Sequence, residues 1–362
     1  MKILHLDAFT GFGGGQKRYT NIAEQLSAKN HELILVSRKN SEVDKIFPGK
    51  VYSSSFLGDL DVFSFFRIFQ IILREKPDII HTHSHQDHWI GGIVSKLFPT
   101  VKLVHTRHVD FKIKNNFINK WMYSTLTDCI ITSCRAIKDT LLASFTDIPN
   151  FGDKIYPILT INPPKKKGKK GQIRKELNLK GEIIVSMVTR LVDWKGHKYL
   201  FQAIPLIIEK IKNIRFLIVG DGPYLHKLKE MAHRLDIEEY VIFTGFRNDV
   251  DNVYADTDIS VLPSEMESPG VSIAESIFHE IPVITSNVGG IPEIVKDGYN
   301  GFLIEVGDAE AIAERVIKLI NDENLYKKIK NNCRKWKEKK MSEKTPAEKI
   351  EIIYKKIINR SS

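Results

Sequence analysis

The chain has 362 residues, of which 42% are hydrophobic and 27% are charged, and its formal net charge is +10. This length and composition are typical of a globular protein with two domains, each large enough to bury a core. No apolar run is long enough to cross a bilayer, and the first nine residues resemble a strand rather than a signal peptide. The three cysteines, Cys129, Cys134 and Cys333, lack metal-knuckle spacing, which excludes a cysteine zinc site and fits a reducing compartment. We therefore expect a cytoplasmic protein.

The excess positive charge is concentrated in two runs, residues 165–175 and 327–340. Such runs are usually solvated faces or linkers, and this is the interpretation we favour. The functional alternative is attraction to an anionic surface. Because the sequence has no zinc finger and no RNP-type aromatic strand, we expect an anionic membrane rather than nucleic acid as the partner.

The chain opens with an expected strand at 2–6, a glycine-rich loop and a helix at about 16–29. Gly13, Gly14 and Gly15 at this strand-to-helix turn indicate backbone amides that face a phosphate or a sugar. The dinucleotide fingerprint fails, because its third glycine position holds a glutamine or an arginine and no acid follows the second strand. The turn is therefore of nucleotide-fold type without the NAD signature.

Further buried strands are expected at 79–81, 102–105 and 129–132. The apolar segment 63–73 between the early strands predicts a core-packing helix, with membrane contact as the minor alternative. Residues 111–123 interleave aromatic side chains with lysines. That pattern fits equally well an interfacial surface on lipid headgroups and a helix with a basic face.

Residues 83–88 have the sequence HSHQDH, which matches the HxHxDH pattern of the binuclear zinc site in the metallo-β-lactamase superfamily. Imidazole and carboxylate ligands at this spacing could hold zinc and activate a water molecule. Such a site also needs later histidine ligands, and no histidine occurs between His108 and His197. A zinc-dependent metallohydrolase is therefore kept only as the alternative function.

The second half repeats the alternation of strands and helices after a lysine-rich run that marks an expected domain boundary at 164/165. Short buried strands between helices indicate a parallel sheet covered on both faces. The strands are expected at 183–188, 215–219, 241–243, 258–262, 283–285 and 302–304, and a last amphipathic helix at 344–359.

Two cations follow the first strand of this half in one loop, Arg190 and Lys195. Because open α/β sheets bind ligands at the carboxyl ends of their strands, this pair suits a diphosphate. Farther along, Glu267 and Glu275 flank an expected helix start. We predict Ser268 as its N-cap and Pro269 as its first residue, so that the next amides face an anion or polar oxygens.

Five stretches in this order, RLVDWKG, VGDGP, FTGFRNDV, ESPGVSIAES and VGGIPEIVKDGYNGFL, resemble the retaining GT-B glycosyltransferases of family 4. In the first half, GGGQKRYTNIAEQL resembles the glycine loop and first helix of that family. HTHSHQDHWIGG together with VHTRHVDF resembles the subgroup that builds lipopolysaccharide core and other surface polysaccharides. The stretch 83–88 then becomes a strand and loop of the family rather than a zinc site.

The resemblance implies an α/β protein of the GT-B fold, with two Rossmann-like doubly wound parallel-sheet domains facing a central cleft. Residues 1–164 would form the acceptor-side domain and residues 165–340 the nucleotide-sugar-binding domain. Residues 341–362 would form a C-terminal helix that crosses back to the first domain, and the domains would close over the donor.

The resemblance also assigns roles to matching positions. Arg190 and Lys195 would bind the donor diphosphate and do the work of a metal, so no metal and no other cofactor is expected. Glu267 would hold the transferred sugar and Glu275 the ribose hydroxyls. His108 would contact the sugar near its anomeric carbon, with His105 as a rival for that role. The implied catalytic residues are thus His108, Glu267, Arg190 and Lys195.

The donor-binding set implied in this way combines backbone amides, cations and carboxylates. Its members are Gly14, Gly15, Arg190, Lys195, Phe246, Arg247, Glu267, Gly270, Val271, Ser272 and Glu275, with Phe246 and Arg247 flanking the base. The sequence assigns no role to Glu265, a further acid beside the site.

The implied reaction moves a sugar, with retention of configuration, from a nucleotide-diphosphate sugar to a lipid- or polysaccharide-linked acceptor. The leaving diphosphate would help to deprotonate the incoming hydroxyl. We expect a metal-independent hexosyl- or related glycosyltransferase of lipopolysaccharide core or surface glycan assembly, peripheral on the inner face of the cytoplasmic membrane. The donor base (UDP, GDP or ADP), the sugar and the acceptor stay open at this point.

Overall fold

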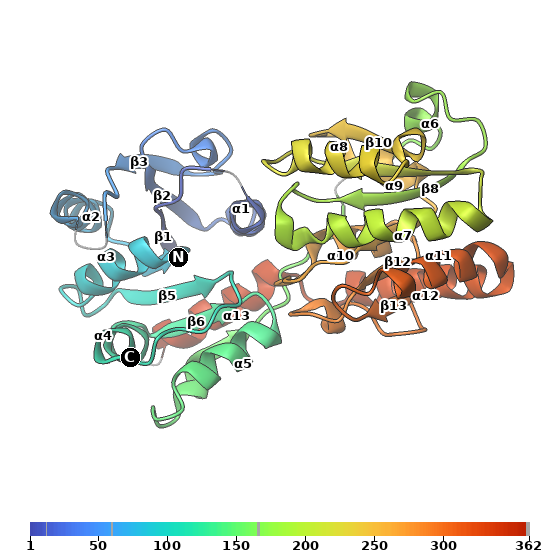
Figure 1. Cartoon of the computed structure of the whole chain (residues 1–362). Helices are drawn as coiled ribbons and strands as arrows, with labels where there is room; N and C mark the ends of the chain where they lie inside the picture. Colours follow the sequence, from blue (N-terminus) through green and yellow to red (C-terminus); the bar gives the residue numbers. More distant parts are fainter. Residues whose placement is uncertain (12, 59–60, 165–166, 360–362) are drawn as a thin grey trace. The chain divides into compact units, whose positions relative to one another are not determined.

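The computed structural model describes residues 1–11, 13–58, 61–164 and 167–359. The chain forms two compact α/β units, coloured from blue to red along the sequence in Figure 1. Unit 1 comprises Met1–Ile161 and Lys344–Ser362, and unit 2 comprises Asn162–Glu343. The start of the predicted lysine-rich linker, Lys165 and Lys166, lies outside the described residues. Within them, no helix combines the length and apolar character that a bilayer-spanning segment needs.

Unit 1 contains a sheet of seven parallel strands in the order β3-β2-β1-β4-β5-β6-β7. Its strands are β1 (Lys2–Asp7), β2 (Glu32–Arg38), β3 (Lys50–Ser54), β4 (Ile79–Thr82), β5 (Lys102–Arg107), β6 (Cys129–Thr132) and β7 (Ile155–Pro157). Its α-helices are α1 (Gly14–Ser27), α2 (Val62–Glu75), α3 (His85–Ser95), α4 (Phe117–Lys120), α5 (Arg135–Ser144) and α13 (Pro346–Asn359). Short 3-10 turns lie at Glu42–Lys45 and Phe151–Lys154, and a π-helical turn at Trp121–Leu126.

Successive side chains of a strand point to opposite faces of the sheet, which gives unit 1 two cores. On one face, Ile3 of β1 packs with buried residues of α1 and of the last helix, α13. On the other face, Leu4 packs with buried residues of α2 and α3. Both faces of the sheet are therefore covered by helices, as Figure 1 shows.

Unit 2 contains six parallel strands in the order β10-β9-β8-β11-β12-β13. Its strands are β8 (Ile183–Val188), β9 (Ile214–Val219), β10 (Val241–Gly245), β11 (Ile259–Leu262), β12 (Val283–Ser286) and β13 (Gly301–Ile304). Its α-helices are α6 (Gln172–Glu176), α7 (His197–Lys210), α8 (Leu225–Arg234), α9 (Val250–Asp256), α10 (Val271–Phe278), α11 (Ala309–Asn321) and α12 (Glu323–Ser342). Its 3-10 turns are Asp193–Lys195, Glu238–Tyr240 and Ile291–Glu293.

In each sheet the direction of strand addition reverses once, between β1 and β4 in unit 1 and between β8 and β11 in unit 2. The two sheets confirm the predicted α/β class with doubly wound parallel-sheet domains. In open sheets of this kind, ligands bind outside the carboxyl ends of the strands at the point of reversal. The loops after β1, β4, β8 and β11 are therefore the places to look for a site.

Candidate functional site

In unit 2, the loop after β8 reaches the loop after β11. The backbone N–H of Glu265 donates to the carbonyl of Trp194 over 2.8 Å. Gly196 has a φ of +75°, and a Cβ added there would lie 1.9 Å from the carbonyl oxygen of Pro263. The two loops can come together only because position 196 has no side chain.

This approach brings Lys195 and Glu267 together as an ion pair. The two side chains are only 19% and 9% exposed, and Ser264 Oγ donates to the same carboxylate oxygen over 3.0 Å. A pair that is largely shielded from water interacts more strongly than one on the open surface. Two residues predicted to be catalytic, 72 positions apart in the chain, are thus in contact at the point where the strand order of the sheet reverses.

The helix after β11 begins later than predicted. The prediction of Ser268 as N-cap and Pro269 as first residue is wrong, because α10 begins at Val271 with Gly270 as its N-cap. Gly270 has a φ of +62°, and a Cβ there would lie 2.3 Å from Cδ1 of Ile291. Glycine is favoured at such a left-handed position, and it ends the extended loop and starts the helix.

The N-terminus of α10 carries the amides that the sequence assigned to ligand binding. The first helical hydrogen bond runs from Ala274 N to Gly270 O over 3.0 Å. The amides of Val271 and Ser272 therefore precede the first donor that has a partner inside the helix, at the positive end of the helix dipole. This end of α10 can bind an anion or sugar hydroxyl oxygens.

Glu275, one turn into α10, is held by a residue that the sequence did not indicate. Tyr254 Oη lies 3.2 Å from Oε2 of Glu275 and 3.3 Å from the carbonyl of Ser272. Burial and the neighbouring carboxylate raise the pKa of Tyr254 well above its usual value, so the phenol stays a donor. A lone tyrosine on a separate helix carries no pattern in the sequence, which explains why Tyr254 was missed.

The other residues of unit 2 that were predicted to bind the donor differ in their exposure and in their side-chain partners. Arg190 is exposed two residues after the end of β8, and in the described part of the chain no acid pairs with it. Phe246 is 72% exposed. Arg247, in contrast, forms a fork with Glu176 (2.6 and 2.8 Å) and bonds to Asp249 (2.8 and 2.9 Å). Its guanidinium is thus already committed to holding the loop beside Phe246.

Glu265, to which the sequence assigned no role, has two side-chain partners in the structure. Its carboxylate accepts from Tyr199 Oη over 2.7 Å and pairs with Lys198 Nζ at 2.8 Å, both on α7. These two partners lower the pKa of Glu265. Glu265 therefore ties the loop after β11 to α7.

In unit 1, two predicted residues lie beside each other. A Cβ on Gly15 would lie 3.6 Å from the His108 ring, and Arg18 Nη2 lies 3.3 Å from Nδ1 of His108. Burial and the charge of Arg18 lower the pKa of His108 well below its usual value, so its imidazole is neutral. The rival His105 instead lies in the core, where its ring stacks on that of His88 with centroids 3.7 Å apart.

The stretch 83–88 does not form the zinc site that its pattern resembles. The Asp87 carboxylate accepts from the amides of His83 (2.9 Å), Ser84 (2.9 Å) and Ala8 (3.0 Å), so it fastens the start of α3 to the loop after β1. His88 turns toward the core, with Nε2 2.7 Å from Thr127 Oγ1. Nothing in this arrangement supports the metallohydrolase alternative.

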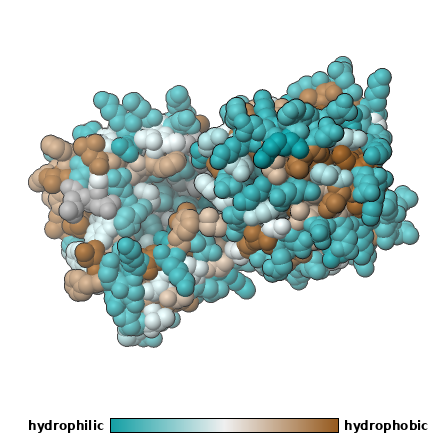
Figure 2. Space-filling view, in the orientation of Figure 1, coloured by the Kyte–Doolittle hydropathy of each residue, from teal (hydrophilic) through white to brown (hydrophobic). Residues whose placement is uncertain are grey.

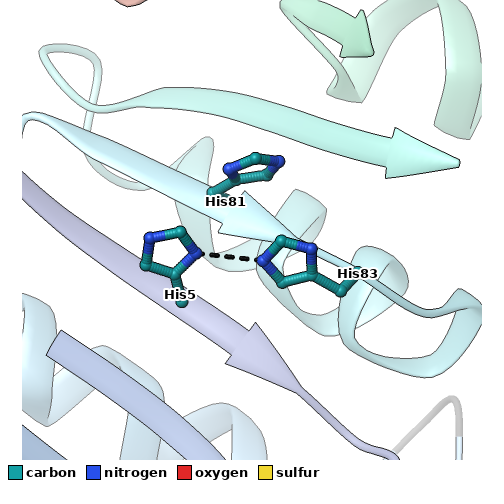
Figure 3. A group of neighbouring side chains, drawn as sticks. All are labelled: His5, His81 and His83. Carbon is teal, nitrogen blue, oxygen red and sulfur yellow. Dashed lines mark hydrogen bonds between the residues drawn. The ribbon is translucent and has the colours of Figure 1, made fainter. Parts of the chain in front are cut away.

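A different group of histidines comes closest to metal-ligand geometry (Figure 3). Of the residues that the structure describes, His5, His81 and His83 are the one set whose ligand atoms all lie within 4.8 Å of one another. His5 Nδ1 and His83 Nε2 are hydrogen bonded at 3.0 Å. Both nitrogens of His81 already have hydroxyl partners, Tyr354 at 2.5 Å and Thr106 at 2.6 Å. We interpret the group as a hydrogen-bond network that fastens α13 to β4.

Two protein-family models match the chain. The model described as Glycosyltransferase Family 4 matches residues 12–154, in unit 1, and the model described as Glycosyl transferases group 1 matches residues 169–336, in unit 2. Each match therefore falls within one of the two units described above.

Curated relatives cover most of the chain. It is 24% identical over 370 residues to the N-acetyl-alpha-D-glucosaminyl L-malate synthase of Bacillus anthracis, covering 96% of this chain and 95% of that protein. It is 28% identical over 297 residues to the UDP-Gal:alpha-D-GlcNAc-diphosphoundecaprenol alpha-1,3-galactosyltransferase of Escherichia coli, covering 76% and 74%. The crystal structure of a glycosyltransferase from Rickettsia africae has the same fold, with a TM-score of 0.84 at 22% identity over 99% and 98% of the two chains.

Proposed function

Because the chain is a glycosyltransferase of the GT-B fold, we propose that it transfers a sugar from a nucleotide-diphosphate donor to a lipid-linked acceptor, with retention of configuration. The observation that carries this proposal is the shielded Lys195–Glu267 pair beside the N-terminus of α10. A cation, a carboxylate and helix amides at the reversal of a doubly wound sheet suit a ligand that is anionic at one end and rich in hydroxyls at the other.

We propose that Arg190 and Lys195 bind the anionic end of the donor, its diphosphate. On donor binding, Lys195 would share its charge between Glu267 and a diphosphate oxygen, and the exposed guanidinium of Arg190 would close on the second phosphate. These cations, together with the amides of Val271 and Ser272, would stabilise the charge that develops as the sugar departs. No metal is needed for that role in this proposal.

We assign the hydroxyl-bearing parts of the donor to the carboxylates. Glu275, held by Tyr254, would accept from the ribose, and Glu267 from the transferred sugar. Phe246 would cover the base, while Arg247 holds its loop. For unit 1 we keep the prediction that His108 contacts the donor sugar and that Gly14 and Gly15 approach the phosphates.

For retention we propose a route without a covalent intermediate on Glu267. Its carboxylate is already bonded to Lys195 and Ser264, so it is a poor nucleophile for a covalent intermediate. The acceptor hydroxyl would instead attack from the face that the diphosphate leaves. Its proton would pass to the departing diphosphate oxygen as the new bond to the anomeric carbon forms.

The acceptor is inferred from the relatives. The name of the Escherichia coli relative specifies a UDP-sugar donor and a diphosphoundecaprenol acceptor. We extend this to a lipid- or polysaccharide-linked acceptor in lipopolysaccharide core or surface glycan assembly, at the inner face of the cytoplasmic membrane. The Bacillus anthracis relative points to a second candidate, a small hydroxy acid such as L-malate.

Product analysis tests the proposal. The purified protein, kept in EDTA, is incubated with UDP-, GDP- and ADP-sugars and with either a diphosphate-linked lipid sugar or L-malate. We expect release of one nucleoside diphosphate with the lipid acceptor, and proton NMR should show the anomeric configuration of the donor in the product. An inverted product would overturn the retaining mechanism, and transfer to malate alone would replace the acceptor assignment.

A further inference from the structure

Helix α2 of unit 1 exposes an unusual set of side chains. Its inner residues, Ser64, Ile68, Ile71 and Ile72, are buried. Its outer residues include Phe63 (78% exposed), Val62 (60%), Phe66 (58%) and Leu73 (53%). The predicted core-packing role of this segment therefore describes only half of the helix.

The exposed residues of α2 form one continuous stripe. At 100° per residue, Val62, Leu73, Phe66, Gln70, Phe63, Arg74 and Arg67 fall in this order within an arc of about 140°. The apolar side chains occupy the first part of the arc, and the two arginines lie together at its edge. None of the exposed residues of α2 is an acid. Glu75 is only 11% exposed and is bonded to Lys50 and Tyr52, and its carboxylate lies 3.7 Å from Nε of Arg74, whose side chain stays 72% exposed.

The apolar surface continues beyond the helix. Phe69 of α2 packs against Phe98, with ring centroids 5.2 Å apart, and the neighbouring Leu97 is 54% exposed. Leu57, before α2, is exposed as well. Figure 2 shows brown and tan side chains gathered at the left edge of unit 1, where Figure 1 places α2. We call Leu57, Leu97 and the stripe on α2 the α2 surface.

We infer that the α2 surface binds an anionic lipid bilayer, with its phenylalanines inserted at the level of the headgroups and its arginines paired with lipid phosphates. Large apolar side chains beside cations, with no acid, are the composition of helices that lie in a membrane interface. This inference rests on the proposed function, since a membrane-bound acceptor requires the enzyme to work at a bilayer.

Charge complementarity favours a membrane over other occupants. A soluble protein partner would have to complement both the arginines and the exposed phenylalanines along a single convex helix. A second copy of this chain would offer the same stripe, which has arginines but no exposed acid to pair with them. An anionic bilayer satisfies both halves of the surface, because it offers a low-dielectric interior next to a plane of phosphates.

Vesicle co-sedimentation tests the inference on the full chain, using phosphatidylcholine vesicles with and without phosphatidylglycerol. We expect binding that increases with the anionic lipid. Two double variants are compared with the wild type: Phe63→Ser with Phe66→Ser, and Arg67→Gln with Arg74→Gln. Each should reduce partitioning into the anionic vesicles by about tenfold or more. Transfer to a water-soluble acceptor analogue should be unchanged in both variants.

Matched controls come from other exposed positions. Lys328→Gln with Lys335→Gln removes the same charge from the basic helix α12, and Ile352→Ser removes an exposed apolar side chain from α13. We expect neither to change vesicle binding. Equal losses from the α12 pair would overturn the inference in favour of a general electrostatic attraction, and a change in oligomeric mass on mutating α2 would favour self-association.

The proposed function and the α2 surface fail in different ways. If nucleoside diphosphate binds but the α2 variants sediment with vesicles as the wild type does, the inference is wrong and the proposed function stands. If no nucleoside diphosphate binds, the proposed function fails whatever the vesicles show.

Discussion

At the scale of single residues, function depends on which acids are free to bind a ligand. Three glutamates lie in the segment that follows strand β11 of unit 2, and they differ in the partners of their side chains. Glu265 is tied to α7 through Lys198 and Tyr199. Glu267 is paired with Lys195, a group that a diphosphate can recruit, and Glu275 accepts a hydrogen bond from the phenol of Tyr254.

The first prediction separates Glu267 from Glu265. Glu267→Gln removes the charge that orients Lys195 and replaces a charged acceptor for the sugar hydroxyl by a weaker neutral one, so we expect kcat to fall by about 10²–10³-fold. Glu265→Gln, the matched control, should lower kcat by less than about tenfold, because its carboxylate contacts α7. Equal losses in steady-state nucleotide release would contradict the assignment.

The second prediction concerns Glu275 and Tyr254. Glu275→Ala should abolish detectable transfer and leave the melting temperature near that of the wild type, since the side chain is partly exposed at the start of the helix. Tyr254→Phe keeps the carboxylate but loses its donor, and we expect a rise in KM for the nucleotide sugar of about three- to tenfold. A Tyr254→Phe enzyme with unchanged KM would show that the phenol does not position Glu275.

At the scale of elements, helix α10 depends on a backbone conformation that glycine provides. We expect Gly270→Ala to lower the free energy of unfolding by about 1–3 kcal/mol, from its φ of +62° and its approach to Ile291, and to weaken nucleotide binding. The control is Gly298→Ala, which has a similar φ of +67° but no atom within 4 Å of the added Cβ. Urea titrations of both variants separate backbone strain from the steric contact, and equal destabilisation with unchanged binding would refute a special role for position 270.

Unit 1 buries several histidine side chains, on its strands, after β4 and on α3. Burial lowers the pKa of five of them below the usual histidine value, to about 3 for His5. They are His5, His81, His83, His88 and His105. The unfolded chain therefore binds protons near pH 6.5 that the folded chain does not, and stability is lost as the pH falls below that value. Asp7 and Asp87 act in the opposite direction, because burial raises the pKa of both carboxyl groups, to about 8 for Asp87.

We therefore predict a net loss of stability between pH 7 and pH 5.5. Each neutral histidine contributes up to about 1.4 kcal/mol per pH unit below its unfolded pKa, and the five histidines outweigh the two carboxyl groups. Urea unfolding at both pH values should show a lower midpoint at pH 5.5, and His105→Asn should make the pH dependence shallower. A midpoint that rises on acidification would show that these histidines are charged in the folded protein.

At the scale of the whole molecule, the sequence was sufficient for the architecture but not for the partners of single side chains. The alternation of short apolar strands with helices predicted a parallel sheet in the second half, and the resemblance to GT-B glycosyltransferases implied two doubly wound sheets. The helix start failed at Ser268 and Pro269, because local capping preferences could not anticipate Ile291 crowding position 270. Contacts such as Arg247 with Glu176, 71 residues apart, depend on tertiary packing that no local pattern encodes.

The central claim is that unit 2 binds a nucleoside diphosphate through Lys195 and Arg190 without a metal. Isothermal titration of UDP, GDP and ADP into the protein in EDTA tests it most directly. We predict that one of them binds, and that Lys195→Ala with Arg190→Ala weakens it at least about a hundredfold, since each charge-assisted hydrogen bond contributes about 1.5–3 kcal/mol. Binding that requires added divalent metal, or that survives loss of both cations, would contradict the account.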